Sequence, residues 1–284
     1  MRKNFSLNDS SVLITGATAG LGAEFARQLA PVSRHLILTG RRQDRLHELA
    51  TTLQQKHPRI KLTQYCADLS STAERERLAS WIIREEIPLN LLVNNAGLGD
   101  LGSFDTATWE RLSEMLDVNI CALTHLTHRL LPMMKLQSSS GSSVGIINVS
   151  SVAGFFPLPG LAVYAATKSY VTSFSEGLRM ELSKEGIRVT TLCPGPVPTE
   201  FFQVAARPKQ STNAGDRTHP MLASSARLVV SAAIRALERD RPGVIPNRLL
   251  AFLVRAVCLL PFPIVRAAIR SGAGPRKPEI ATKN

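Results

Sequence analysis

The chain has 284 residues, a length that fits either one large α/β domain or two small domains. Hydrophobic residues make up 44% of it and charged residues 20%, a balance that excludes a disordered or fibrous protein. The formal net charge of +12 admits nucleic acid, an anionic membrane surface or an anionic cofactor as partner. Because the sequence contains no recognisable nucleic-acid-binding module, we expect no nucleic-acid partner.

The excess positive charge is concentrated near the C-terminal end. From Arg241 to Asn284 there are eight Lys or Arg residues and one acid, Glu279, so more than half of the excess lies there. Residues Met1 to Ser11 are polar and lack the apolar region of a secretory signal, so we expect a cytoplasmic protein. The four cysteines are widely spaced, and we expect buried free thiols and no metal site at Cys66, Cys121, Cys193 and Cys258.

Short apolar runs alternate along the chain with helix-like segments. The alternation predicts βαβ units with right-handed crossovers and a parallel sheet that is buried on both faces. No linker precedes about Pro194, so we expect one doubly wound Rossmann-type domain over residues 1–246, followed by a helical extension over 247–284. Strands are expected over 12–15, 35–39, 61–66, 89–93, 144–149 and 187–192, with helices after the first strand and over 43–55, 109–135 and 163–184.

A glycine-rich turn follows the first predicted strand. Gly16 permits a tight turn, Gly20 removes a side chain where backbone approaches a pyrophosphate, and Gly22 lets the next helix pack on the sheet. The N-terminus of that helix offers free N–H groups and the positive end of its dipole to phosphates. The spacing is G-x-x-x-G-x-G, and its place between a strand and an amphipathic helix predicts a dinucleotide site. The expected contacts are Gly16, Thr18, Gly20, Leu21 and Gly22.

Two arginines, Arg41 and Arg42, follow the second predicted strand. A cofactor with a free ribose 2′-hydroxyl calls for Asp or Glu at this place, whereas a guanidinium binds a 2′-phosphate with two hydrogen bonds. Their position favours this interpretation over ordinary solvated surface charge. The sequence therefore predicts NADP(H) as the cofactor in preference to NAD(H).

A tyrosine and a lysine, Tyr164 and Lys168, lie at positions i and i+4 of a predicted helix and share one face. An ammonium group favours the phenolate form of a neighbouring tyrosine and so lowers its pKa, which suits proton transfer. Ser151 follows the fifth predicted strand, at the edge where open α/β sheets bind ligands. Its hydroxyl is placed to hold a substrate carbonyl, while Ser150 is equally well explained as part of a strand-end turn.

Further motifs complete an ordered set along the chain. They are Thr15-Gly16-x-x-x-Gly20-x-Gly22, Asp68-Leu69, Asn94-Asn95-Ala96-Gly97, Asn119, Ser151, Tyr164-x-x-x-Lys168 and Pro194-Gly195-Pro196-Val197-x-Thr199. In this order and spacing the chain resembles the short-chain dehydrogenase/reductase family over about residues 8 to 240. The run from Thr39 to Leu46 resembles the NADP-preferring members that act on alcohols and carbonyls.

The resemblance implies roles at individual positions. Tyr164 would be the acid/base, Lys168 would lower its pKa and bond the nicotinamide ribose, and Asn119 would help to hold a proton-supplying water chain. With Ser151 these form the expected catalytic set. One departure is Ala19, where some NADP-dependent relatives carry a basic residue. The implied cofactor contacts beyond the glycine turn and Arg41 and Arg42 are Asp68, Leu69, Asn95, Ala96, Gly97, Tyr164, Lys168, Pro194, Gly195, Val197 and Thr199.

The segment after Pro194-Gly195 covers the substrate in members of this family. In this chain the segment from Thr199 to Met221 mixes phenylalanines with basic residues, and its Gly and Pro residues suggest a lid that orders on binding. The phenylalanines suit an apolar or amphiphilic carbonyl compound, and they serve equally well as packing residues.

The segment from Asn247 to Arg270 is an apolar stretch bounded by arginines, which Pro261 and Pro263 break into two short helices. It is too short and interrupted for a spanning helix. Two interpretations stay open. Either it is a basic amphipathic element at a membrane interface, or it is a helix pair packed over the substrate cleft or against another subunit. From Gly272 onward we expect disorder.

The residues together predict a hydride transfer between NADP(H) and a carbonyl or secondary alcohol, in a homo-oligomer that is a dimer or tetramer. One alternative is a cofactor-sensing regulator without turnover, against which the retained acid/base set argues. The others are a basic protein that binds nucleic acid or membrane, and a membrane-associated enzyme acting on lipid-like ketones.

Overall fold

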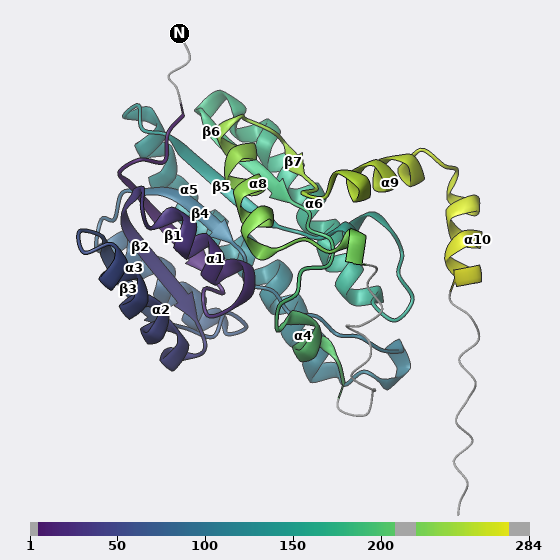
Figure 1. Cartoon of the computed structure of the whole chain (residues 1–284). Helices are drawn as coiled ribbons and strands as arrows, with labels where there is room; N and C mark the ends of the chain where they lie inside the picture. The colour runs from purple at the N-terminus through teal and green to yellow at the C-terminus, as the bar shows by residue number, and fades with distance from the viewer. Residues whose placement is uncertain (1–4, 208–219, 273–284) are drawn as a thin grey trace, which may run out of the picture.

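The computed structural model describes residues 5–207 and 220–272. Within these residues one sheet of seven parallel strands has the order β3-β2-β1-β4-β5-β6-β7, and helices cover both of its faces (Figure 1). This is the predicted Rossmann-type doubly wound fold. The strands are β1 (Ser10–Thr15), β2 (Ser33–Gly40), β3 (Lys61–Cys66), β4 (Leu89–Asn94), β5 (Val144–Val149), β6 (Ile187–Leu192) and β7 (Gly243–Val244).

The helices alternate with the strands and then continue beyond the sheet. They are α1 (Gly20–Leu29), α2 (Gln43–Lys56), α3 (Thr72–Arg84), α4 (Trp109–Leu116), α5 (Leu123–Ser139), α6 (Ala162–Leu182), α7 (Phe201–Ala205), α8 (Ala226–Glu238), α9 (Arg248–Cys258) and α10 (Phe262–Gly272). Four of these elements, α3, α7, α8 and β7, add to those expected from the sequence. Pro261 lies at the predicted break between α9 and α10, whereas Pro263 lies in the first turn of α10.

Two apolar cores lie on opposite faces of the sheet because side chains alternate along each strand. Val12 and Ile14 of β1 pack with α1, α2 and α8, whereas Leu13 points the other way and packs with α3, α5 and α6. The interior strands are therefore apolar on both faces, as a parallel sheet covered by helices requires.

The helix expected over 109–135 is one continuous path with a π-helical segment, Asp117–Ala122, between α4 and α5. Such an insertion widens the helix locally and often occurs at functional positions. It carries Asn119, which is 1% exposed and bonds to backbone outside the helix. The predicted long helix is therefore present, and the π-helical segment is a feature that the sequence did not predict.

The cysteines are all free, but the prediction that all four are buried was wrong. Only Cys193, which follows β6 within the sheet, is buried, and Cys66, Cys121 and Cys258 are exposed. Burial raises the pKa of the Cys193 thiol to about 11.

Parts of two predicted segments lie outside the described residues. Residues 208–219 of the predicted lid do so, as do residues 273–284 of the tail for which disorder was expected. In the described part of the chain, no single helix has the length and apolar character needed to cross a membrane. Taken together, α9 and α10 meet those criteria, but the pair is bent by 120°.

The buried histidine of β2 predicts an acid-sensitive stability. His35 is 5% exposed and shares a hydrogen bond of 2.9 Å with the Thr63 hydroxyl of β3. Its pKa is lowered from 6.5 to about 4, first by burial and then by the nearby positive charges of Lys61 and Arg34. Between these two pH values the unfolded chain binds a proton that the folded chain does not. Stability must therefore fall as the pH falls from 6.5 towards 4.

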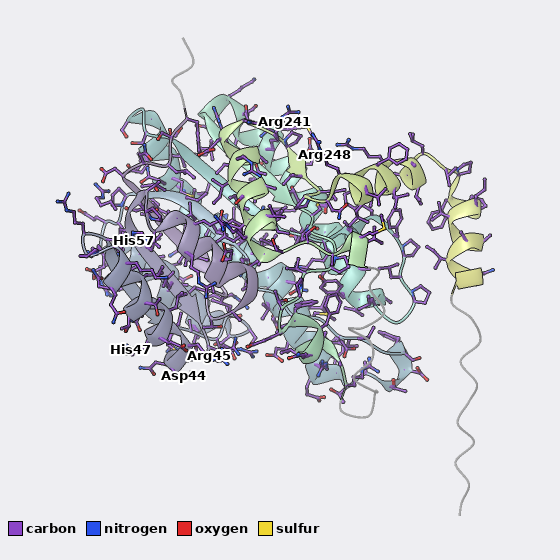
Figure 2. The ribbon with its side chains drawn as sticks, in the orientation of Figure 1. Asp44, Arg45, His47, His57, Arg241 and Arg248 are labelled. Atoms are coloured by element: carbon purple, nitrogen blue, oxygen red, sulfur yellow. The ribbon has the colours of Figure 1, made fainter. Side chains whose placement is uncertain are left out.

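We expect His35→Gln, which keeps a hydrogen-bonding group, to remove this part of the pH dependence. Urea unfolding should show that the free energy of unfolding falls between pH 7 and pH 4.5 by about 2–3 kcal/mol more in the wild type than in the variant. The exposed His47 on α2 (Figure 2) offers a control, because His47→Gln should retain the wild-type loss. Equal losses in all three proteins would contradict the assignment.

Candidate active site

A cleft of about 750 Å³ opens at the carboxyl edge of the sheet. It brings together sequence-predicted residues from segments up to 183 positions apart, between Gly16 and Thr199. Two predicted residues, Gly22 and Asn119, lie behind its wall. The predicted residues that line it are Gly16, Thr18, Gly20, Leu21, Arg41, Arg42, Asp68, Leu69, Asn95, Ala96, Gly97, Ser151, Tyr164, Lys168, Pro194, Gly195, Val197 and Thr199.

The glycine turn between β1 and α1 is shaped for close backbone approach. Gly16 has a φ of +65°, and a Cβ there would lie 2.8 Å from the Cα of Ala96. At Gly22 a Cβ would lie 2.1 Å from the carbonyl oxygen of Gly16, so only glycine fits. Helix α1 begins with no side-chain cap and no acid in its first turn, which leaves its N–H groups free for an anion. The turn therefore fits the pyrophosphate of a dinucleotide.

The end of β4 holds this turn in place. The amide nitrogen of Asn95 donates from its side chain to the carbonyl oxygens of Thr15, at 2.8 Å, and Gly16, at 3.1 Å. The Thr15 hydroxyl accepts from the backbone N–H groups of Asn95 and Ala96. Asn95 is thus a positioning residue for the phosphate turn as well as a part of the cleft wall.

Both predicted phosphate-binding arginines are paired with carboxylates across the cleft mouth. Arg41 donates to Glu114, and Arg42 donates to Glu200 at 2.9 Å. Arg42 also reaches the Thr18 hydroxyl at 3.3 Å, which ties it to the glycine turn. The side chains of Arg41 and Arg42 are 48% and 42% exposed. Exposed ion pairs are weak, so a bound anion could replace the two carboxylates.

Tyr164 and Ser151 face each other at the inner end of the cleft. Tyr164 is 8% exposed, and burial raises the pKa of its phenol to about 12, although the hydrogen bond with Ser151 acts in the opposite direction. The Ser151 hydroxyl also accepts from the Ala153 N–H at 3.1 Å, which fixes its direction. The neighbouring Ser150 bonds to the carbonyl of Lys168 and to Thr172, so it supports the strand end, as the turn interpretation predicted.

The ammonium group of Lys168 lies beside this pair. Its Nζ is 5.7 Å from the centroid of the Tyr164 ring and donates to the Val149 carbonyl at 3.0 Å. Burial lowers the pKa of Lys168 to about 8, and only the charge of Cys193 acts against this. A Cβ at Gly97 would lie 3.3 Å from this Nζ and 3.4 Å from the Asn119 Oδ1, so the glycine makes room for both groups.

Asn119 projects from the π-helical segment into the space behind Gly97. Its Oδ1 accepts from the Leu98 N–H at 2.8 Å, and its Nδ2 donates to the Leu98 carbonyl at 2.9 Å. The same Nδ2 is 2.9 Å from the Thr167 hydroxyl on α6, so Asn119 links the β4 loop to the helix of Tyr164 and Lys168.

The outer part of the cleft is lined by residues that the motifs did not identify. These side chains are mostly apolar, which favours an apolar or amphiphilic ligand in this part of the cleft. Phe201 of α7 lies over Tyr164, with ring centroids 5.5 Å apart. Two residues come from α9, at the far end of the chain. The apolar residues are Leu98, Leu101, Val118, Val152, Ala153, Phe156, Leu158, Leu161, Phe201, Phe202, Val204, Ala205, Leu250 and Val254.

A buried carboxylate fixes α7 over the cleft. Asp100 is 5% exposed, accepts hydrogen bonds from Arg207 and forms an ion pair with Arg111, whose Nε lies 2.7 Å from its carboxylate. Arg111 also donates to the carbonyls of Val204 and Ala205 at the end of α7. Burial raises the pKa of Asp100, but the hydrogen bonds and charges of the two arginines hold it below its usual value. No sequence pattern marks this clamp, because Arg207 is 107 residues away.

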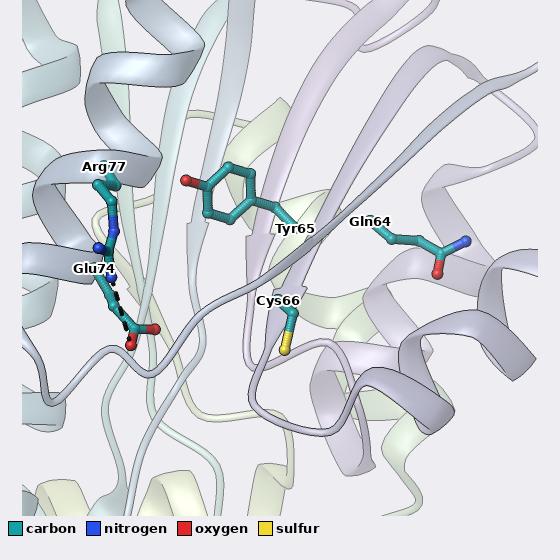
Figure 3. Close-up of a pocket in the computed structure, with 5 residues that line it drawn as sticks. All are labelled: Gln64, Tyr65, Cys66, Glu74 and Arg77. Atoms are coloured by element: carbon teal, nitrogen blue, oxygen red, sulfur yellow. Dashed lines mark ion pairs between the residues drawn. The ribbon is translucent and has the colours of Figure 1, made fainter.

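A second, smaller pocket of about 210 Å³ lies at the end of β3 (Figure 3). It is lined by Gln64, Tyr65, Cys66, Glu74 and Arg77, and Glu74 pairs with Arg77 at 3.7 Å. The Glu74 carboxylate also accepts from the backbone N–H of Asp68, so this pocket backs the turn that carries Asp68 and Leu69. None of the four predicted catalytic residues lines it.

Comparisons with known proteins identify the family of the chain. The model of the short chain dehydrogenase family matches residues 10–210. The chain is 40% identical over 202 residues to sulfoacetaldehyde reductase 2 of Chromohalobacter salexigens, covering 68% of this chain and 75% of the other. It is 37% identical over 195 residues to the NADP-dependent 3-hydroxy acid dehydrogenase of Escherichia coli, covering 68% and 75%. A short-chain dehydrogenase from Sphingobium yanoikuyae, solved in complex with NADPH, aligns with a TM-score of 0.76, 29% identity and coverage of 97% and 99%.

The Asp100 clamp predicts how firmly α7 is held. Asp100→Asn removes the charge that faces Arg111 and Arg207, and charge-assisted hydrogen bonds are worth about 1.5–3 kcal/mol each. We expect the amides of Val204 and Ala206 to exchange with deuterium about tenfold faster or more, while α1 is unchanged.

Hydrogen–deuterium exchange with mass spectrometry of peptides over residues 200–207 measures this effect. Glu185→Gln is a suitable control because it breaks an exposed pair with Lys135 and should leave these peptides as they are. Unchanged exchange in Asp100→Asn would show that α7 is held by its apolar contacts alone.

Proposed function

The chain belongs to the short-chain dehydrogenase family, and on that premise we propose that it transfers a hydride between NADP(H) and a carbonyl or secondary alcohol. It is an oxidoreductase of that family. The observation that carries the finer proposal is the grouping of Ser151, Tyr164 and Lys168 in one buried corner of a cleft whose other end suits a dinucleotide.

The preference for NADP(H) rests on Arg41 and Arg42. No carboxylate occupies the place at the end of β2 where a free ribose 2′-hydroxyl would be bound, and two guanidinium groups lie there instead. The paired carboxylates of Glu114 and Glu200 keep these cations in position, and a 2′-phosphate would replace them. The Escherichia coli relative is named as NADP-dependent, and the Sphingobium neighbour binds NADPH, which supports the same preference.

When bound, the nicotinamide cofactor supplies the hydride in the reductive direction. The chain's own residues then donate or accept the proton. Tyr164 donates its phenolic proton to the carbonyl oxygen, and Ser151 donates a hydrogen bond to the same oxygen, so both stabilise the negative charge that develops there. In the oxidative direction Tyr164 takes the proton back.

The raised pKa of Tyr164 explains why a neighbouring cation is needed. Burial favours the neutral phenol, which is ready to donate, but it penalises the phenolate left after donation. The buried Lys168 Nζ lies 5.7 Å from the ring centroid, and in the proposed reaction its positive charge would stabilise that phenolate. Asn119 acts as a positioning residue that holds the Leu98 backbone and α6 around this corner.

The substrate class follows from the outer wall of the cleft. Leu158, Leu161 and Phe201 present apolar surface next to Tyr164, and no free cation lines this part of the cleft in the described residues. We therefore propose an apolar or amphiphilic carbonyl compound. The regulatory alternative is disfavoured because a sensor has no use for a buried acid/base pair.

Tyr164→Phe separates catalysis from binding. The change removes only the hydroxyl, so turnover of a ketone screen with NADPH should fall by about 10²–10⁴-fold or more. NADPH affinity by fluorescence titration should stay within about twofold, because the ring and its packing remain. Tyr170→Phe, an exposed tyrosine on the same helix, should retain both properties. Full turnover in Tyr164→Phe would exclude the proposed mechanism.

Arg41→Asp tests the cofactor preference. It replaces a 2′-phosphate ligand with a repelling charge, so NADPH binding should weaken by about 10–100-fold while NADH binding changes little. Glu200→Gln should act in the opposite direction and tighten NADPH binding, because Arg42 loses its competing carboxylate. The exposed Arg59→Asp carries the same charge change at a remote site and serves as control. Equal binding of both cofactors, unaffected by Arg41→Asp, would favour NAD(H).

A further inference from the structure

The last two helices form an arm at the edge of the molecule. Helix α9 leaves the body next to β7, and α10 turns away from it (Figure 1). We use the term arm for residues 248–270. Large apolar side chains are exposed along it, including Phe252 at 68% and Leu259 at 86%. The full set of exposed large apolar residues is Leu249, Phe252, Leu253, Leu259, Leu260, Phe262 and Ile264.

The two sides of α9 have different partners. Leu250 and Val254, four residues apart, share the inward face and line the cleft. Leu250 packs closely against Gly195, because a Cβ added to Gly195 would lie 2.3 Å from the Cδ2 of Leu250. Leu249 and Leu253 lie on another stripe and are 43% and 41% exposed, so nothing in the described chain covers the outer apolar side.

The charges on the arm are of one sign. Arg248, Arg255, Arg266 and Arg270 are exposed, and residues 241–272 contain no acid. Figure 2 shows Arg248 at the start of α9 and Arg241 just before it. Among the described residues none of the four arginines of the arm has a carboxylate partner within ion-pair distance, in contrast to Arg41 and Arg42. These cations are thus available to an external anionic surface.

Arginines and apolar side chains share the outward side of the helices. Arg248 and Arg255 are seven residues apart and lie on one stripe, which borders the stripe of Phe252 and Leu259. Arg266 stacks on Phe262, with its guanidinium carbon 4.9 Å from the ring centroid. Long basic side chains that flank an apolar face reach lipid headgroups while the apolar groups enter the acyl boundary.

We propose that the outer side of the arm binds the surface of a membrane that carries anionic lipids. The 120° bend between α9 and α10 and the shortness of each favour helices that lie in the interface instead of crossing it. A second copy of the chain is a poorer occupant, because each copy carries a net charge of +12 and would bring more positive charge to an arm that has no acid. The proposal does not depend on the proposed activity.

Membrane binding through the arm would also place the cleft beside the lipid. The inward face of α9 forms one wall of the cleft while its outward face meets the membrane. An apolar or amphiphilic carbonyl compound dissolved in the membrane would then lie close to the cleft mouth.

Vesicle flotation of the full-length protein tests the proposal. The protein should float with vesicles of phosphatidylcholine mixed with phosphatidylglycerol and remain behind with phosphatidylcholine alone. The double variant Phe252→Glu/Leu259→Glu should weaken vesicle binding by about tenfold or more, because it removes the two most exposed large apolar side chains of the arm. Arg255→Gln/Arg266→Gln should weaken it by roughly fivefold per charge, and high salt should reproduce part of that loss.

Matched controls carry the same kinds of change at exposed positions outside the arm. Leu136→Glu/Leu228→Glu replaces two leucines that are 72% and 62% exposed, and Arg59→Gln/Arg84→Gln removes two exposed cations. Both should bind vesicles within about twofold of the wild type. Light scattering of all proteins in solution is the second measurement. Absence of binding to anionic vesicles, or equal loss in arm and control variants, would overturn the proposal. An oligomer that dissociates only in the arm variants, without vesicle binding, would assign the arm to a second copy.

Discussion

The burial of a parallel sheet on both faces is the constraint on which the rest of this structure depends. Because all strands run the same way, their carboxyl ends meet at one edge, and the loops that follow β1, β4, β5 and β6 converge there. The helices that connect β1, β2 and β3 cover one face of the sheet, and those that connect β4, β5 and β6 cover the other face. The strand order therefore reverses between β1 and β4, and this reversal opens the crevice between them. Asn95 bridges that crevice by bonding to Thr15 and Gly16, so the phosphate turn is anchored to the strand end that leads to the catalytic corner.

Hydrogen bonds to the backbone or between side chains stabilise the buried polar groups around the cleft. Asn94 and Asn148 bond across β4 and β5 at 2.9 Å, and Asn148 reaches Ser175 on α6. Lys168 relies on the Val149 carbonyl, and Asn119 on the backbone of Leu98. The same low-dielectric surroundings raise the pKa of Tyr164 to about 12 and lower that of Lys168 to about 8.

The outer wall of the cleft has a different origin from its inner corner. It is built by α7, which the Asp100 clamp holds, and by α9, which arrives from beyond the residues matched by the family model. The inner corner is lined by the residues of the motifs, whereas the outer wall is lined by apolar residues outside those motifs.

The sequence by itself determined the fold, the glycine turn after β1 and the shared helix face of Tyr164 and Lys168. These depend on local patterns, namely strand-length apolar runs, glycine spacing and the i, i+4 relation of Tyr164 and Lys168. Only the tertiary structure decided which carboxylates face Arg41 and Arg42, why the path over 109–135 contains a π-helical segment, and which cysteine is buried. It also decided that Asp100 holds α7 and that Leu250 and Val254 enter the cleft. The reason is physical: these features arise from contacts between residues far apart in the chain, and no local periodicity encodes which distant side chain will be the partner.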